Sequence, residues 1–308
     1  MAQVTAVPPV PPLAPLRARA PGGRLAGAID VFRLIARKPL GLLGLAGVLF
    51  FFVLAFVMPT FIPYDDRVDV LAIYQAPSLV HPLGTDSSGR DVWVQIVHGG
   101  KDILVVGLAA ALLSTFIAVT FGALAATVGG KVDTAVVTVT DIWLTIPHLP
   151  LLVVLAAVVT LNSLLYIALI IGILGWASLL RQIRAQVLSL KERDYVEAAR
   201  SLDLGLPHII FREILPSMRS YIVIHFILSM TSAIYAVVAL LLLGLVPLSG
   251  QNWGLMLNYA YTRGAIFFRD SIWYIASPII AIVLFQLSLV WLASALEDIF
   301  NPRLRGSA

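Results

Sequence analysis

The sequence predicts an all-α integral membrane protein with six transmembrane helices. Hydrophobic residues make up 59% of the 308-residue chain and charged residues only 12%, whereas soluble domains carry roughly 25% charged residues. Because the long apolar stretches are continuous rather than alternating, they favour helices over the strands of a membrane barrel. The uncharged stretches are residues 40–62, 103–130, 142–180, 220–262 and 271–296.

Each apolar stretch predicts a number of spans from its length, because a helix needs about 20 apolar residues to cross the hydrocarbon core. The first, second and last stretches predict one span each. Residues 142–180 are long enough for two spans, with a break expected at Asn162–Ser163. The fourth stretch predicts one span to Val246, followed by a segment, PLSGQNWG, that is expected to form an outer loop or a re-entrant piece.

The N-terminal end precedes the first span. Residues 1–28, rich in Pro and Ala, predict a disordered tail. Residues 28–38 are amphipathic and are expected to lie along the membrane surface. The chain has no cysteine, which excludes disulfides and thiolate metal sites.

The distribution of Lys and Arg predicts the orientation. With the N-terminus inside, the inner segments hold 16 of the 21 Lys and Arg, and the outer segments hold five. The inner segments are then 1–38, 131–135, 181–219 and 301–308, and the outer segments are 63–102 and 247–270. The positive-inside rule therefore predicts that both termini and residues 181–219 are cytoplasmic.

Residues 181–219 form a polar insert with 12 charged side chains between two apolar stretches. Within it, residues 191–206 predict a short helix with acidic residues early, where they suit the helix dipole, and with its end at Pro207. A second element, 208–215, is expected to stop at Pro216. Small apolar residues mixed with charges suit a protein interface, although an ordinary solvated loop remains open.

One part of the insert resembles a known family. EAARSLDLGLPHIIFREILP, residues 197–216, resembles the EAA loop of ATP-binding-cassette (ABC) importer permeases. Glu197-Ala198-Ala199 and Ile214-Leu215-Pro216 match the family pattern in residue and separation. The family's glycine six positions after the Glu is Asp203 here, and we expect Gly205 to supply the turn instead.

Other segments resemble the C-type permease subunit of dipeptide and oligopeptide importers. Residues 37–66 resemble its extra N-terminal span, residues 81–101 (HPLGTDSSGRDVWVQIVHGGK) the segment before its second span, and residues 301–305 (NPRLR) its C-terminal ending. Residues 81–101 contain a motif in the predicted outer loop, which we call the outer motif. It is expected to form a local ion-pair lock, to face an extracytoplasmic binding protein, or both. Its residues are Gly84, Thr85, Asp86, Gly89, Arg90 and Asp91.

The resemblance implies a transport subunit that is not an enzyme. Its domain plan is an N-terminal tail (1–28), an amphipathic helix with the first span (29–62), an extracytoplasmic loop (63–102), a five-helix permease core (103–300) with a coupling loop (181–219), and a C-terminal tail (301–308). The residues implied to couple to an ATPase are Glu197, Ala198, Ala199, Asp203, Gly205, Ile214, Leu215 and Pro216.

The implied partners are a homologous second permease, two ATP-binding-cassette ATPase subunits and an extracytoplasmic substrate-binding protein. Because the chain has no G-x-x-x-x-G-K-[ST] motif, ATP and Mg are expected on the ATPase subunits. The substrate is expected to be a dipeptide or oligopeptide by resemblance. Cello- or manno-oligosaccharides and nickel, which the same branch also handles, stay open.

Two other classes of membrane protein find little support in the sequence. A secondary transporter working alone would show inverted repeats and several intramembrane charges, but Asp141 is the one acidic residue near a span interior, and we expect it to pair structurally. A membrane-embedded hydrolase or transferase would need a nucleophile–base set, which is not visible. His148 and His225 are expected to be packing residues rather than proton relays or metal ligands.

Several prolines and glycines interrupt the apolar stretches. They are expected either to serve packing, as is common in transmembrane helices, or to supply kinks for a gate. They are Pro147, Pro150, Gly172, Gly175, Gly244, Pro247 and Pro278.

Overall fold

The computed structural model describes residues 32–159, 163–246 and 251–300. The predicted tails 1–28 and 301–308, with the NPRLR ending, lie outside the described residues, as do Asn162 and Pro247. The predicted amphipathic segment 28–38 is described from residue 32, and residues 32–36 are helical.

Within the described part of the chain, five helices are long and apolar enough to cross a membrane. They are α2 (Pro39–Phe56), α3 (Val92–Val128), α6 (Leu164–Leu190), α10 (Arg219–Leu242) and α12 (Ile272–Phe300). Helices α4 (Gly130–Thr145) and α5 (His148–Val158) make a sixth crossing if they count as one bent span. The predicted all-α membrane fold is confirmed.

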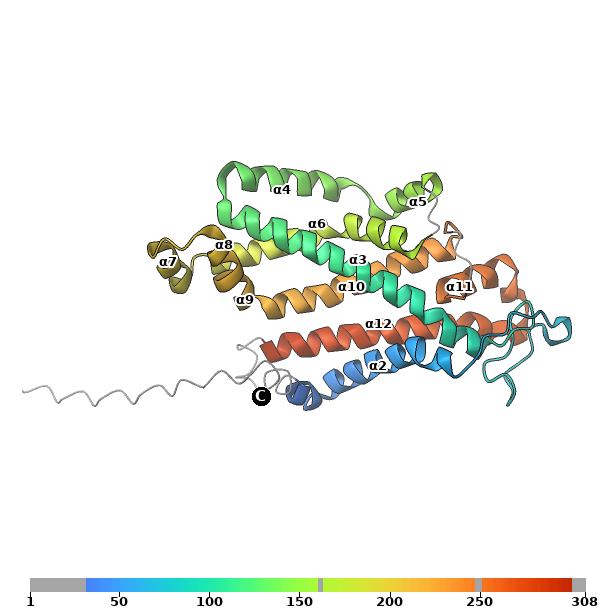
Figure 1. Ribbon diagram of the computed structural model, residues 1–308. Helices are drawn as coiled ribbons and strands as arrows, with labels where there is room; N and C mark the ends of the chain where they lie inside the picture. Colours follow the sequence, from blue (N-terminus) through green and yellow to red (C-terminus); the bar gives the residue numbers. More distant parts are fainter. Residues whose placement is uncertain (1–31, 160–162, 247–250, 301–308) are drawn as a thin grey trace, which may run out of the picture.

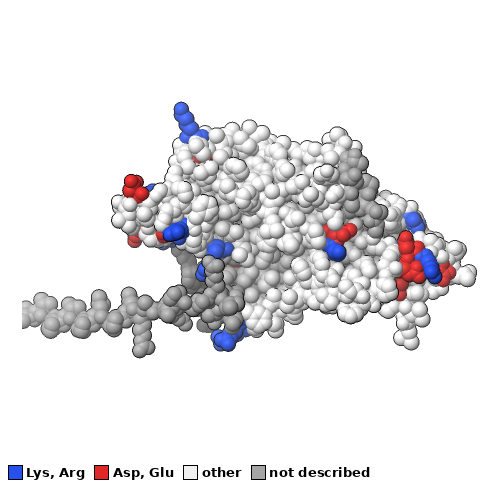
Figure 2. Space-filling view, viewed as in Figure 1, with Lys and Arg blue, Asp and Glu red and all other residues white. Residues whose placement is uncertain are grey.

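The long helices lie side by side along one direction (Figure 1). At one end lie the start of α2, the end of α12 and the short helix α7 (Asp194–Ser201). At the other end lie residues 57–91 and helix α11 (Trp253–Thr262). Figure 2 shows the charged side chains mainly toward the two ends of the visible face, and the surface between them is uncharged apart from one small group of acidic and basic side chains. This distribution suits a protein whose middle lies in lipid.

Helix α3 begins earlier than predicted. Its first residue is Val92 rather than residue 103, because the side chain of Asp91 caps the helix and accepts a hydrogen bond from the Val94 amide at 3.1 Å. The predicted outer loop 63–102 is therefore irregular only to residue 91. One 3₁₀ turn, η1 (Met58–Thr60), precedes the loop, and another, η2 (Val70–Ala72), lies within it.

The third span is broken, which the apolar pattern did not predict. Gly129 and Gly130 have positive φ angles of 71° and 55°, so the chain reverses there and α4 occupies the predicted turn 131–135. Helix α4 then stops before Pro147, and α5 leaves at 80° to it. Proline disfavours helical geometry in the preceding residue. The chain therefore bends at Pro147, one of the interruptions expected to serve packing or to supply kinks.

Two glycines within the long helices serve packing. Helix α6 runs without a break through Gly172 and Gly175, and α12 runs through Pro278. A Cβ added at Gly172 would lie 2.8 Å from Leu113 Cδ2, so this glycine lets α3 and α6 approach closely. A Cβ added at Gly44 of α2 would lie 2.6 Å from the Leu292 backbone nitrogen of α12. Small residues permit such close contacts between membrane helices.

Candidate functional site

The polar insert 181–219 is only partly a loop. Helix α6 continues to Leu190, so the first ten residues of the insert belong to a membrane helix. In place of the predicted helix 191–206 the structure has the shorter helix α7, which ends at Ser201. After it come α8 (Leu206–His208), the π-helical turn η3 (Ile209–Ile214) and α9 (Leu215–Ser217). The prediction that Pro207 ends a helix is wrong, because Pro207 lies in the first turn of α8, where its missing N–H costs nothing.

Asp203 makes the turn between α7 and α8. Its φ angle is +52°, in the left-handed region that glycine enters freely and that Asp tolerates better than most residues. The Leu204 amide donates to the Ala199 carbonyl at 3.1 Å across this turn. Gly205 has a φ angle of −56°, so the expectation that Gly205 replaces the family glycine is wrong. Asp203 itself adopts the conformation that a glycine would adopt.

The insert has an inner and an outer face. The inner face packs on α3 and α6 through the buried side chains of Val196, Ala199, Ile209, Ile210, Ile214 and Met218. The outer face carries Glu197 and three apolar side chains, with Leu202 73% exposed, Leu206 45% and Phe211 68%. We call these four residues the outer coupling face. Exposed apolar groups beside a charge are typical of a protein interface.

The predicted coupling residues divide between these faces. Ala199 and Ile214 are buried inside the chain, and Leu215 is half-buried. The exposed members are Glu197, Ala198, Asp203, Gly205 and Pro216.

Two ion pairs join α4 to α6 near the same end of the molecule. Arg181 donates to Asp141 at 2.5 Å, so the predicted pairing of Asp141 is confirmed. Arg184 forms a bidentate salt bridge with Asp133, in which Nε donates to Oδ1 at 2.5 Å and Nη2 donates to Oδ2 at 2.6 Å. The sequence interpretation missed the second pair. The signal was present, because the two acids are eight residues apart on one helix face.

At the opposite end, the outer motif forms a compact loop around Asp86. This carboxylate is 1% exposed and accepts hydrogen bonds from the Ser88 and Arg90 amides at 2.7 and 2.9 Å. It also accepts from Arg90 Nε at 3.1 Å and from Gln95 Nε2 at 2.9 Å. The predicted ion-pair lock is therefore confirmed for Asp86 and Arg90.

Asp91 pairs with His81 rather than joining the ion pair of Asp86 and Arg90. Its carboxylate lies 2.9 Å from His81 Nδ1 and caps α3. Thr85 links two parts of the loop, since its hydroxyl donates to the Ala72 carbonyl and accepts from the Gln75 amide. Gly84 and Gly89 have φ angles of 74° and 76°, so each of them occupies a turn that other residues would strain.

Arg90 also binds the start of the outer loop. Its guanidinium donates to Asp66 at 2.6 Å and to the Tyr64 hydroxyl at 3.3 Å. Burial works against the charge of Arg90, but Asp86, Tyr64 and Asp66 outweigh it and raise the pKa of the guanidinium. Burial also raises the pKa of the Tyr64 phenol. The cluster is thus a structural clamp that ties the start of the outer loop to the turn before α3.

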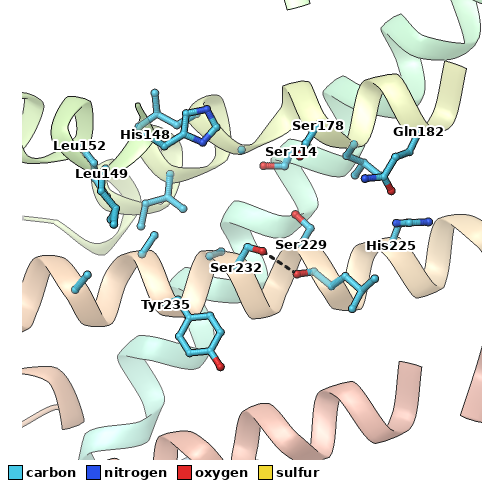
Figure 3. A pocket seen from close by; sticks show the side chains of 18 residues that line it. Ser114, His148, Leu149, Leu152, Ser178, Gln182, His225, Ser229, Ser232 and Tyr235 are labelled. Atoms are coloured by element: carbon cyan, nitrogen blue, oxygen red, sulfur yellow. Dashed lines mark hydrogen bonds between the residues drawn. The ribbon is translucent and has the colours of Figure 1, made fainter. Parts of the chain in front are cut away.

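Between the two ends lies a groove that the sequence interpretation did not find. It has a volume of about 870 Å³ and is lined by residues of α3, α5, α6 and α10. Figure 3 shows Gln182 of α6 and His225 of α10 projecting toward each other from opposite walls, with Ser229 and Ser232 farther along α10. His148 lies at the α5 side. The two histidines predicted to be packing residues thus both line this groove.

The described residues contain no group of three or more His, Asp or Glu able to hold a metal ion. The fold and these features define a multi-pass membrane protein with a polar insert at one end and a clamped loop at the other. The class is a transport component rather than an enzyme.

The chain belongs to the family of binding-protein-dependent transport system inner membrane components, which matches residues 118–306. It is 35% identical over 247 residues to a predicted peptide permease protein of Brucella suis, covering 80% of this chain and 81% of that protein. It is 31% identical to the oligopeptide transport system permease protein OppC of Bacillus subtilis, over 86% of both chains. It is 30% identical to the dipeptide transport system permease protein DppC of the same organism, over 90% and 86%. The chain is thus an ABC importer permease.

Proposed function

We propose that this chain is a permease subunit of an ABC importer for dipeptides or oligopeptides. It pairs with a homologous second permease, and the two form the translocation pathway. Two ATPase subunits bind ATP and Mg, and a substrate-binding protein delivers the solute from outside. Alternating access, driven by ATP, moves the solute inward.

The observation that carries this proposal is the two-faced insert. Its inner face is packed firmly on α3 and α6, so a force on the outer coupling face reaches the membrane helices rather than bending a loop. The outer coupling face offers Glu197 for a basic partner group and Leu202, Leu206 and Phe211 for an apolar groove. We assign this face to the ATPase subunit.

The membrane orientation follows from the same assignment. Both termini and the α7 end are cytoplasmic, which agrees with the excess of Lys and Arg in the segments at that end. Residues 63–91 and α11 then face the substrate-binding protein. The domain plan keeps residues 29–62 as an added N-terminal part, but the core begins at Val92, where α3 starts, rather than at residue 103.

The names of the relatives support a peptide as the substrate, since they are peptide, oligopeptide and dipeptide permeases. The groove supports it too, because its lining can bind amide groups. Import of an oligosaccharide, but no peptide, by the assembled complex would contradict this assignment.

The coupling role is tested by Glu197→Lys in the complete complex, reconstituted in liposomes. We expect assembly in the membrane to persist but ATPase stimulation by the loaded binding protein to be lost, because an exposed charge is reversed at the proposed interface. Glu192→Lys is the matched control, since this exposed acid lies before α7. Normal stimulation in Glu197→Lys would refute the coupling role.

A further inference from the structure

The groove between α6 and α10 has a wall of hydrogen-bonding side chains without charge. None of its lining residues is Asp, Glu, Lys or Arg. On α10, His225, Ser229 and Ser232 recur at helical spacing and share one face. On α6, Ser178 and Gln182 recur at the same spacing. A polar stripe on each of two membrane helices is costly against lipid, so the stripes need water, a solute or a partner beside them.

Several of these side chains have no partner in the part of the chain that the structure describes. Among the described residues, no hydrogen bond reaches the side chains of Ser178, Gln182 or Ser229. By contrast, Ser114 at the groove wall is satisfied, because its hydroxyl donates to the Gly172 carbonyl at 2.7 Å and ties α3 to α6. Ser232 also has a partner, because its hydroxyl donates to the Leu228 carbonyl of its own helix at 3.3 Å (Figure 3), so the side chains left free are those of Ser178, Gln182 and Ser229.

We propose that this groove is a transit subsite that binds the main-chain amides of the peptide and is indifferent to the charges of its side chains. Hydroxyl and carboxamide groups each donate and accept hydrogen bonds, so they match both the N–H and the C=O of a peptide. The volume of about 870 Å³ lies within the range of sites for small ligands. The inference rests on the proposed function and names the residues of this chain that meet the substrate.

The absence of charge along the groove gives a physical reason for its indifference. A fixed carboxylate or ammonium group would favour peptides of opposite charge and repel those of like charge. Uncharged groups do neither, so selection among peptides falls to other parts of the complex. Gln182 and His225, projecting toward each other in Figure 3, mark the end of the groove nearer the polar insert.

The first test uses the fact that the chain has no cysteine. Ser229→Cys and Ser232→Cys are placed separately in the complete complex, with native cysteines of the partner subunits replaced, and treated with a water-soluble, membrane-impermeant thiol reagent. We expect modification of each thiol to abolish peptide uptake, and transported peptide to slow the modification. Val283→Cys on the exposed face of α12, away from the groove, is the matched control and should stay unmodified with uptake intact.

The second test changes the charge of the groove. In Ser229→Asp we expect uptake of an acidic tripeptide to fall by about tenfold relative to uptake of a basic one. Repulsion between like charges a few ångströms apart in a partly dry site weakens binding of the acidic peptide by at least this factor. The wild-type complex supplies the reference ratio for the same two peptides and the same binding protein.

The outcomes separate the two proposals. If the wild-type complex imports peptide, but both thiols are unreactive or their modification leaves uptake unchanged, the groove is a packing face for the second permease and this inference is wrong. An unchanged ratio of the two tripeptides in Ser229→Asp would likewise overturn it. If the wild-type complex imports no peptide, the proposed function itself fails, whatever the thiols show.

Discussion

The clamp around Asp86 allows a quantitative test, because Arg90 binds two carboxylates of very different burial. Asp86 is 1% exposed and Asp66 is 77% exposed, while Arg90 itself is 14% exposed. Removing Asp86 leaves a buried guanidinium without its buried partner, which costs about 3–5 kcal/mol. Removing Asp66 breaks an exposed pair, which is worth about 0–1 kcal/mol. Each substitution removes one carboxylate from Arg90, so the two variants differ mainly in the burial of the carboxylate that is lost.

The quantity to measure is the local stability of the outer loop. Amide hydrogen exchange of residues 84–92 reports it, because the Asp86 amide donates to the Arg90 carbonyl at 2.9 Å and the Val92 amide donates to the Gly84 carbonyl at 3.1 Å. A loss of about 3 kcal/mol accelerates exchange by about a hundredfold. We therefore expect Asp86→Ala to exchange about a hundredfold faster than the wild type, and Asp66→Ala to exchange nearly like it.

Equal exchange in the two variants would refute the reasoning, because it would mean that burial does not decide the strength of the pair. Fast exchange in both would mean that Arg90 depends on the sum of its partners. Arg90→Ala provides a further check. It should destabilise the loop about as much as Asp86→Ala, since it leaves the buried Asp86 without its guanidinium.

The remaining predictions concern backbone conformation and helix packing. Because Asp203 has a φ angle of +52°, Asp203→Gly should keep ATPase coupling and stabilise the turn by up to about 1 kcal/mol, whereas Asp203→Val should destabilise the turn by about 1–2 kcal/mol. Amide hydrogen exchange of residues 199–206 measures both effects. Equal effects of the two substitutions would contradict the turn assignment. Gly44→Ala should destabilise the purified protein by about 1–3 kcal/mol, because the added Cβ would lie 2.6 Å from the Leu292 backbone nitrogen. The thermal unfolding midpoint measures this, with Ala46→Val on the exposed face of α2 as the control; a fall in both variants would argue against a specific contact between α2 and α12.

Much of the candidate site was predictable because its signals are local. The spacing between Glu197 and Pro216 identified the segment to which we assign the coupling role, and Asp86 and Arg90 are close enough in sequence for their pairing to be inferred. The faces of the insert were not predictable. Ala198 and Ala199 are neighbours in the chain, but one is exposed and the other packs inside. That difference depends on where α3 and α6 lie, which a local pattern does not contain.

Residue-by-residue expectations failed where backbone conformation decided the outcome. Gly205 was expected to make the turn because glycine is the residue most often used for positive φ angles, yet Asp203 makes it. Pro207 was expected to end a helix and begins one instead. Both residue types have two opposite uses near a helix end, and the choice depends on where the chain must go next.

The sequence alone was enough to assign the membrane class and the family, because hydropathy and motif spacing depend only on the order of residues. The tertiary structure alone decided which face of the insert is buried and where the groove between α6 and α10 lies. These features arise where segments distant in sequence meet. An uncharged Ser or Gln in an apolar helix looks like any other residue until the position of the neighbouring helix leaves its hydrogen-bonding groups without a partner.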